Sequence, residues 1–130
     1  MTKNTFFQFI DAINRHNVEA IYSLMTDDHT FIDAYGNQVV GKNNMKAAWI
    51  GYFQWFPDHK IEITDLFAEE NKVAAFGFAS GTFQNKKSET NENYWHLPAA
   101  WKAVVSGDKI RRWQVYADTK RPFDIIEKNK

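Results

Sequence analysis

Two stretches of the sequence decide the fold, KVAAFGFASGTF at residues 72–83 and YWHLPAAWKAVVS at residues 94–106. Both are rich in aromatic and β-branched residues, which is typical of strands. Residues 59–68 and 109–119 have the same character. The second half of the chain therefore predicts a meander of four long antiparallel strands.

Turn residues separate these strands. Glu70-Asn71 and Ser106-Gly107-Asp108 supply tight turns, and the polar stretch from Asn85 to Asn93 predicts an exposed loop. Gly77 and Gly81 lie inside a strand, where glycine often marks a bulge or a bend. We therefore expect the sheet to curve strongly.

The residues that precede the meander begin with helical spacing. Apolar residues recur at helical intervals from Thr5 to Asn14, and Thr5 is the expected N-cap. Asn17 is expected to cap a second helix that ends before the polar run Thr26-Asp27-Asp28. Two antiparallel helices joined by a tight turn are predicted.

A pair of short strands and a third helix come next. Residues 29–41 are rich in β-branched and aromatic residues around a Gly36-Asn37 turn, which predicts two strands. Asn43 or Asn44 is expected to cap a helix with a broad apolar face, and Pro57 is expected to end it.

Composition limits the function classes. The 130 residues are the usual size of one domain, so residues 1–130 are expected to form a single one. Sixteen basic residues balance sixteen acidic ones, which argues against nucleic-acid and membrane partners. There is no cysteine, which excludes thiolate chemistry, and no apolar run is long enough to span a bilayer.

A cytoplasmic location is expected, and the residues from Arg121 onward are expected to form a docked tail that frays.

The order of these elements, with several short motifs, resembles a known family. The motifs are Gly41, Phe56-Pro57-Asp58, Asn71-Lys72-Val73-Ala74, Gly81-Thr82, Asp108-Lys109-Ile110, Trp113, Tyr116 and Asp118. Together they resemble the SnoaL-like branch of the nuclear transport factor 2-like superfamily, which also contains ketosteroid isomerase. The resemblance covers roughly residues 6–123, and it rests on the order and spacing of motifs that are individually weak.

The resemblance implies an α+β fold of the cystatin-like type. Three N-terminal helices would pack on a strongly curved, mixed and mainly antiparallel sheet to form a cone-shaped barrel. The open end of the cone would hold a small hydrophobic or aromatic molecule, without cofactor or metal, and one sheet face would form a homodimer. The alternation of Trp95, Leu97 and Trp101 with His96 and Ala100 independently suggests that both faces of that strand are partly buried.

Three polar residues are candidates for acid/base catalysis. Asp118 follows an aromatic strand at a point where SnoaL-like cyclases place an aspartate, and a carboxylate in an apolar pocket acquires a raised pKa. The alternative is that Asp118 caps the turn into Thr119-Lys120 or pairs with Arg121. Asp33 matches the position of the isomerase base, or else it bonds its own turn. His96 is a strand imidazole that could protonate a ligand or simply pack.

The remaining histidines and the rings have other expected places. His16, His29 and His59 have no ligand-like spacing, so no metal site is predicted. At the positions that correspond to the isomerase oxyanion hole, this chain has Phe9 and either Ala100 or a neighbouring residue, which argues against steroid isomerisation. Residues expected to line the pocket are Tyr35, Trp49, Phe53, Phe56, Trp101, Trp113 and Tyr116. Trp113 and Tyr116 have opposite strand parity, so the sequence leaves open which of the two points inward.

Three functions are compatible with this sequence. The first is a cofactor-independent acid/base enzyme such as a cyclase, isomerase or hydrolase, with Asp118 as proton shuttle and Asp33 or His96 assisting. The second is a non-catalytic module that binds a small molecule or serves as a dimeric accessory domain. The third is a protein-binding scaffold whose own rings fill the pocket.

Overall fold

The predicted meander is present in the computed structural model, which describes residues 2–130. Its strands are β3 (Lys60–Glu69), β4 (Lys72–Thr82), β5 (Tyr94–Ser106) and β6 (Lys109–Ala117). Each pairs antiparallel with the next along the chain. The four-strand prediction and its two tight turns are confirmed.

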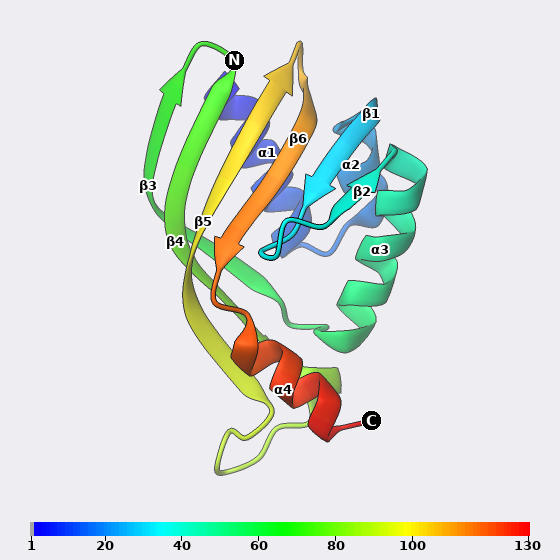
Figure 1. The fold of residues 1–130 in the computed structure, drawn as a ribbon, viewed down its shortest axis with the longest axis vertical. Helices are drawn as coiled ribbons and strands as arrows, with labels where there is room; N and C mark the ends of the chain where they lie inside the picture. Colours follow the sequence, from blue (N-terminus) through cyan, green and yellow to red (C-terminus); the bar gives the residue numbers. More distant parts are fainter. Residues whose placement is uncertain (1) are drawn as a thin grey trace.

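Two further strands complete the sheet. β1 (Met25–Ile32) lies parallel to β6, and β2 (Gln38–Val40) pairs antiparallel with β1, so that the order is β2-β1-β6-β5-β4-β3. The sheet is therefore mixed and mainly antiparallel, as predicted. It is curved but not closed, since β2 and β3 form its two edges (Figure 1).

Gly77 marks the bend, as predicted. The pairing of β3 with β4 shifts register between Ile63 and Asp65, opposite this glycine. A Cβ atom at Gly77 would lie 1.7 Å from the carbonyl oxygen of Glu62. No other residue fits there, which allows the two strands to approach closely and the sheet to curve.

Within residues 2–130, four α-helices pack against one face or one end of the sheet (Figure 1). They are α1 (Thr2–Asn14), α2 (Val18–Ser23), α3 (Lys42–Trp55) and α4 (Lys120–Lys128). Figure 1 shows α1 lying along one face of the sheet, α3 beside β1 and β2, and α4 beyond the end of β6. No helix within residues 2–130 is long and apolar enough to cross a membrane.

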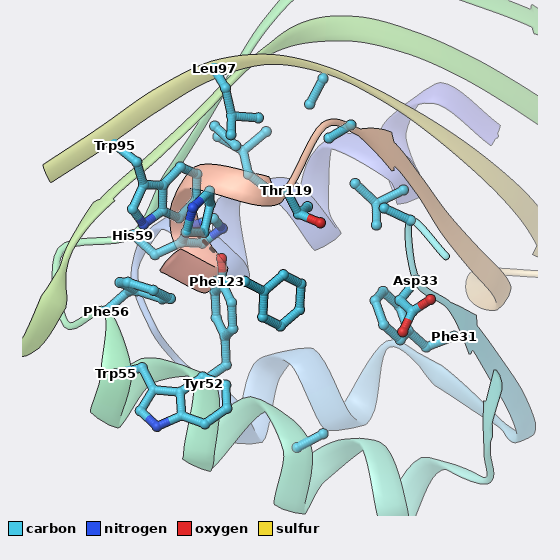
Figure 2. Close-up of a pocket in the computed structure, with 18 of the residues that line it drawn as sticks. Phe31, Asp33, Tyr52, Trp55, Phe56, His59, Trp95, Leu97, Thr119 and Phe123 are labelled. Carbon is cyan, nitrogen blue, oxygen red and sulfur yellow. Dashed lines mark hydrogen bonds between the residues drawn. The ribbon is translucent and has the colours of Figure 1, made fainter. Parts of the chain in front are cut away.

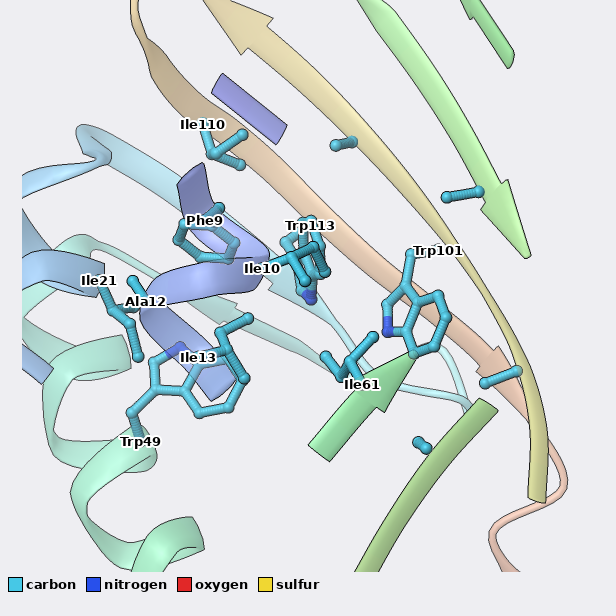
Figure 3. Close-up of a cluster of buried hydrophobic side chains, with 14 of the residues drawn as sticks. Phe9, Ile10, Ala12, Ile13, Ile21, Trp49, Ile61, Trp101, Ile110 and Trp113 are labelled. Carbon is cyan, nitrogen blue, oxygen red and sulfur yellow. The ribbon is translucent and has the colours of Figure 1, made fainter. Parts of the chain in front are cut away.

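The core lies between α1 and the concave face of the sheet. Trp113 of β6 is the largest of its fully buried side chains, and its ring centroid lies 5.4 Å from that of Phe6 and 4.8 Å from that of Phe9 of α1. Figure 3 shows Trp101, Trp113 and Ile61 projecting from the strands toward Phe9 and Ile13 of α1. Phe9 is thus a packing residue.

The first two helix boundaries differ in part from prediction. Asn17 caps α2 as expected, since its Oδ1 accepts the N–H of Ala20 at 3.1 Å. The prediction for Thr5 is wrong, because α1 begins at Thr2 and Thr5 is buried inside it. The polar run Thr26-Asp27-Asp28 also belongs to β1, where Met25, His29 and Ile32 are buried and the two acids stay exposed.

The third helix and the tail also differ in part from the prediction. Neither Asn43 nor Asn44 caps α3; Gly41 occupies that position, and Asn44 donates to the carbonyl of Val40 instead. The helix ends before Pro57, as expected. The tail is docked, as predicted, and it forms the helix α4, because Pro122, Ile125 and Ile126 give it one apolar face that packs on the body of the protein.

Candidate functional site

A cavity of about 300 Å³ lies between α3, α4 and the concave face of the sheet (Figure 2). β5 contributes alternate residues, so Trp95, Leu97 and Trp101 face inward together. Apart from a few polar groups, the wall consists of rings and aliphatic side chains. Those polar groups belong to Asp33, Tyr52, His59, Thr119 and the indoles of Trp49, Trp95, Trp101, Trp113 and Trp55.

The α4 segment forms one wall and part of the opening. Thr119, Pro122, Phe123 and Ile126 of this segment line the cavity. The half-exposed ring of Phe123 lies 5.9 Å from the exposed ring of Tyr35. Both rings line the cavity and are partly exposed to solvent, so α4 contributes to the site.

The inner end of the cavity holds a histidine and a tyrosine in contact. Nδ1 of His59 lies 3.0 Å from the carbonyl oxygen of Ser80 and 3.2 Å from the hydroxyl of Tyr52. The two rings meet edge to face at 4.8 Å. In Figure 2 the Tyr52 ring rises from α3 toward His59, which lies below Trp95.

Backbone bonds around His59 hold it in place. Its N–H donates to the carbonyl of Phe56, and its carbonyl accepts Nε2–H of His16 at 2.7 Å. Asp58 Oδ1 accepts the N–H of Thr82 at 2.6 Å, which ties the connection between α3 and β3 to the end of β4. These hydrogen bonds fix the position of the His59 backbone, and with it the position of the imidazole.

Burial keeps both of these groups uncharged. It lowers the pKa of His59 to about 4, with nearby His16 adding to the effect and the bond to Ser80 opposing it. It raises the pKa of the Tyr52 phenol above its ordinary value. At neutral pH the inner end of the cavity is thus polar but neutral.

Several polar atoms of the wall have no hydrogen-bond partner. Within residues 2–130, the buried side-chain atoms in this state are His29 Nε2, Trp49 Nε1, Trp95 Nε1 and Thr119 Oγ1. Three of the four belong to residues that line the cavity. Thr119 is the N-cap residue of α4, yet its hydroxyl makes no capping bond, and Figure 2 shows it pointing toward the open centre. Buried donors without partners are rare in folded proteins.

Asp33 lines the cavity as the sequence suggested, but it also bonds its own turn. It follows the last residue of β1, and its Oδ1 accepts the N–H groups of Tyr35 and Asn37, both at 2.9 Å. Oδ2 accepts Nδ2 of Asn37 at 3.2 Å. Both alternatives considered for Asp33 are therefore realised, and Oδ2 retains one lone pair for another partner.

The other two catalytic candidates lie outside the cavity. Asp118 is exposed, and its Oδ1 accepts the N–H of Lys120 at 3.1 Å, which is the turn-capping alternative. His96 is exposed on the convex face, where its ring stacks on Phe78 at 5.0 Å. The fold thus brings none of the three candidates Asp33, His96 and Asp118 together.

The predicted ring set is mostly placed as expected. Phe53 is outside the lining and stacks on His16 at 4.4 Å, and Tyr116 points to the convex face. The open question of parity on β6 is thus settled in favour of Trp113. The predicted rings that do line the cavity are Tyr35, Trp49, Phe56, Trp101 and Trp113.

Sequence reasoning missed His59, Tyr52 and Thr119 as polar members of the site. Strand parity could have found two of them. His59 has the same strand parity as the buried Ile61, and Thr119 has the same parity as the inward Trp113. No group of histidine, aspartate and glutamate side chains within the described residues could hold a metal ion.

Sequence comparison identifies one family. The model of the SnoaL-like domain matches residues 6–113, which is most of the chain. Among curated proteins no sequence match is found.

Solved structures share the fold at low sequence identity. An uncharacterised cystatin-fold protein from Novosphingobium aromaticivorans is 22% identical, with a TM-score of 0.76 over 88% of this chain and 96% of its own. A protein from Jannaschia assigned as a SnoaL-like polyketide cyclase is 13% identical, with a TM-score of 0.81 over 96% and 90%. An LEH-like epoxide hydrolase from M. tuberculosis is 11% identical, with a TM-score of 0.79 over 98% and 90%. At such identities the similarity establishes the fold alone.

Proposed function

The chain belongs to the SnoaL-like domain family, and from this premise we propose that it binds a small, mostly apolar molecule in the cavity between α3, α4 and the sheet. The observation that carries the proposal is the cavity of about 300 Å³, whose wall is almost wholly rings and aliphatic groups with a few polar atoms. Small-molecule sites have this size and composition. The similar structures include a cyclase and an epoxide hydrolase, so the fold is compatible with several reactions.

Binding of tetralin and naphthalene, measured by quenching of tryptophan fluorescence and by thermal shift, tests this proposal. A ligand at one hundred times its Kd stabilises the folded state by about 2.7 kcal/mol. Ala48 of α3 lines the cavity and Ala47 does not, so Ala48→Phe should abolish binding and Ala47→Phe should preserve it. Absence of binding by every apolar probe would contradict the proposal and favour a scaffold that binds proteins.

Acid/base catalysis within this cavity is a second candidate. The supporting observation is that Asp33 is the only carboxylate in the lining among the described residues. Asp33→Asn retains the oxygen that accepts the turn N–H groups but removes the base, and Asp118→Asn changes a carboxylate outside the cavity. If a substrate is found by screening epoxides and polyketide-like aromatics, turnover should be lost in the first variant and kept in the second. Binding without turnover in the wild type would favour a non-catalytic module.

We also propose a homodimer through the convex face of the sheet. Phe67 (65% exposed), Phe76 (47%) and Tyr116 (50%) lie on this face of β3, β4 and β6. Exposed rings gathered on one sheet face are typical of an interface. Charged residues flank these rings on the convex face. They are acidic on β3, at Glu62 and Asp65, and basic on β5, at Lys102.

In the proposed dimer, a twofold axis would bring the acidic positions of one copy opposite the basic position of the other. The prediction is checked by sedimentation equilibrium. The wild type should be dimeric, and Phe76→Glu should be monomeric with an unchanged circular dichroism spectrum. A monomeric wild type at high protein concentration would refute it.

A further inference from the structure

The protons of the His59 and Tyr52 pair can be assigned from their contacts. Nδ1 of His59 is near both the Ser80 carbonyl oxygen, at 3.0 Å, and the Tyr52 hydroxyl, at 3.2 Å. A carbonyl oxygen only accepts, so the hydrogen of the shorter contact belongs to Nδ1. When Nδ1 carries the N–H of the neutral imidazole, its electron pair belongs to the aromatic ring. Nδ1 is then only a donor, and it does not accept the Tyr52 proton.

The Tyr52 hydroxyl consequently has a proton to donate elsewhere. Within residues 2–130, Nδ1 of His59 is the only hydrogen-bonding partner of this hydroxyl. Because burial raises the pKa of the phenol, the proton stays on the oxygen at neutral pH. Figure 2 shows the hydroxyl at the inner end of the cavity, beside the ring of Phe123. The free donor thus faces space that a ligand would fill.

A second hydroxyl, that of Thr119, faces the same space. Thr119 Oγ1 is buried, has no partner among residues 2–130, and points toward the open centre of the cavity in Figure 2. No lysine or arginine is among the described residues that line the cavity, whereas the Asp33 carboxylate is. An anionic ligand would meet a like charge without a cation to offset it. The acceptor that suits these donors is therefore a neutral oxygen.

We propose that the cavity prefers an uncharged ligand whose apolar body carries a carbonyl oxygen, that Tyr52 donates a hydrogen bond to this oxygen, and that His59 positions the Tyr52 hydroxyl. This proposal rests on the proposed function, because it requires the cavity to be the binding site. It assigns specificity to two residues that come from the end of α3 and the start of β3. Thr119 supplies a second hydroxyl to the same ligand.

The test compares 1-tetralone with tetralin, two bicyclic probes that differ by one carbonyl oxygen. Wild-type protein should bind 1-tetralone about fifteenfold more tightly than tetralin, with about fivefold from the Tyr52 hydrogen bond and about threefold from the Thr119 hydrogen bond. Tyr52→Phe should reduce this ratio to about three, mainly by weakening 1-tetralone binding. Tyr22→Phe is the matched control, since Tyr22 donates to Asn43 outside the cavity lining. The control should keep the wild-type ratio.

A spectroscopic readout separates this role from a general effect on packing. The carbonyl stretch of bound 1-tetralone should lie at lower frequency in the wild type than in Tyr52→Phe, and nitrogen NMR should show the proton of His59 on Nδ1. If both probes bind and Tyr52→Phe keeps the ratio and the frequency, the inference is overturned while the proposed function stands. A proton on Nε2, with Nδ1 bare, would also overturn it. If neither probe binds, both proposals fail.

Discussion

On β5, Trp95 and Trp101 point to the concave side of the sheet, whereas His96 and Lys102, one step along the chain, point to the convex side. The concave face packs against α1 and encloses the cavity, and its wall includes the buried His59. The convex face has rings of its own at Phe67, Phe76 and Tyr116, but they stand half-exposed beside charged residues. Aromatic content alone therefore does not distinguish a buried sheet face from an exposed one.

The concave and convex sides also differ in the environment that each gives to a histidine. His59 on the concave side is 5% exposed, and burial lowers its pKa to about 4. His96 on the convex side is exposed and stacks on Phe78. The side of the sheet, more than the residue type, decides which imidazole contacts the cavity.

The largest expected difference between the two faces is in stability. Trp113→Ala removes a buried ring that packs on Phe6 and Phe9, and it should lower the free energy of unfolding by about 3–5 kcal/mol. Tyr116→Ala removes a half-exposed ring on the same strand and should cost about 1 kcal/mol or less. Urea unfolding at one low protein concentration measures both. Equal losses would mean that the convex face is as much a part of the core as the concave one.

The second prediction is a pH dependence that comes from the concave side. Because the pKa of His59 is about 4 when folded and near its ordinary 6.5 when unfolded, the unfolded chain binds a proton between these values that the folded chain does not. Stability should therefore fall as the pH decreases from 6.5 toward 4, by about 3 kcal/mol in total from this residue. Burial also lowers the pKa of His29, which acts in the same direction.

His59→Gln tests the assignment, since glutamine can still donate to the Ser80 carbonyl but does not titrate. The slope of the free energy of unfolding between pH 6.5 and 5 should decrease by roughly 1 kcal/mol per pH unit in this variant. The measurement is urea unfolding at several pH values. A slope that is the same in wild type and variant would place the titration elsewhere.

Much of the fold was predictable because each long strand is rich in aromatic and β-branched residues and is bounded by turn residues. The strand lengths, the turns at Glu70-Asn71 and Ser106-Gly107-Asp108, and the bulge at Gly77 follow from local composition. Strand β1 was harder, because parallel pairing with β6 overrides the polar character of Thr26-Asp27-Asp28. The contribution of α4 to the cavity wall was not predictable, because the helix lines the cavity only when the sheet has folded beside it.

The site was predicted less well for a related reason. The position of Asp118 after an aromatic strand suggested a pocket, but the strand ends at Ala117 and Asp118 turns outward to bond Lys120. His59 was set aside because it stands at a strand end, yet its parity with Ile61 directs it inward. Parity around a strand end depends on where pairing stops, which one sequence does not state.

The smallest expected effect comes from two neighbours on opposite sides of this strand end. Thr119 presents a buried, unpartnered hydroxyl to the cavity, and Asp118 presents an exposed carboxylate to solvent. Thr119→Val keeps the side-chain shape and removes the hydroxyl, so it should weaken 1-tetralone binding about threefold and leave tetralin binding unchanged. Asp118→Asn should change neither affinity, and fluorescence titration of the two probes measures both variants. If Asp118→Asn weakened binding as much as Thr119→Val, the division between the two sides would not hold at the end of β6, and Asp118 would return as a member of the site.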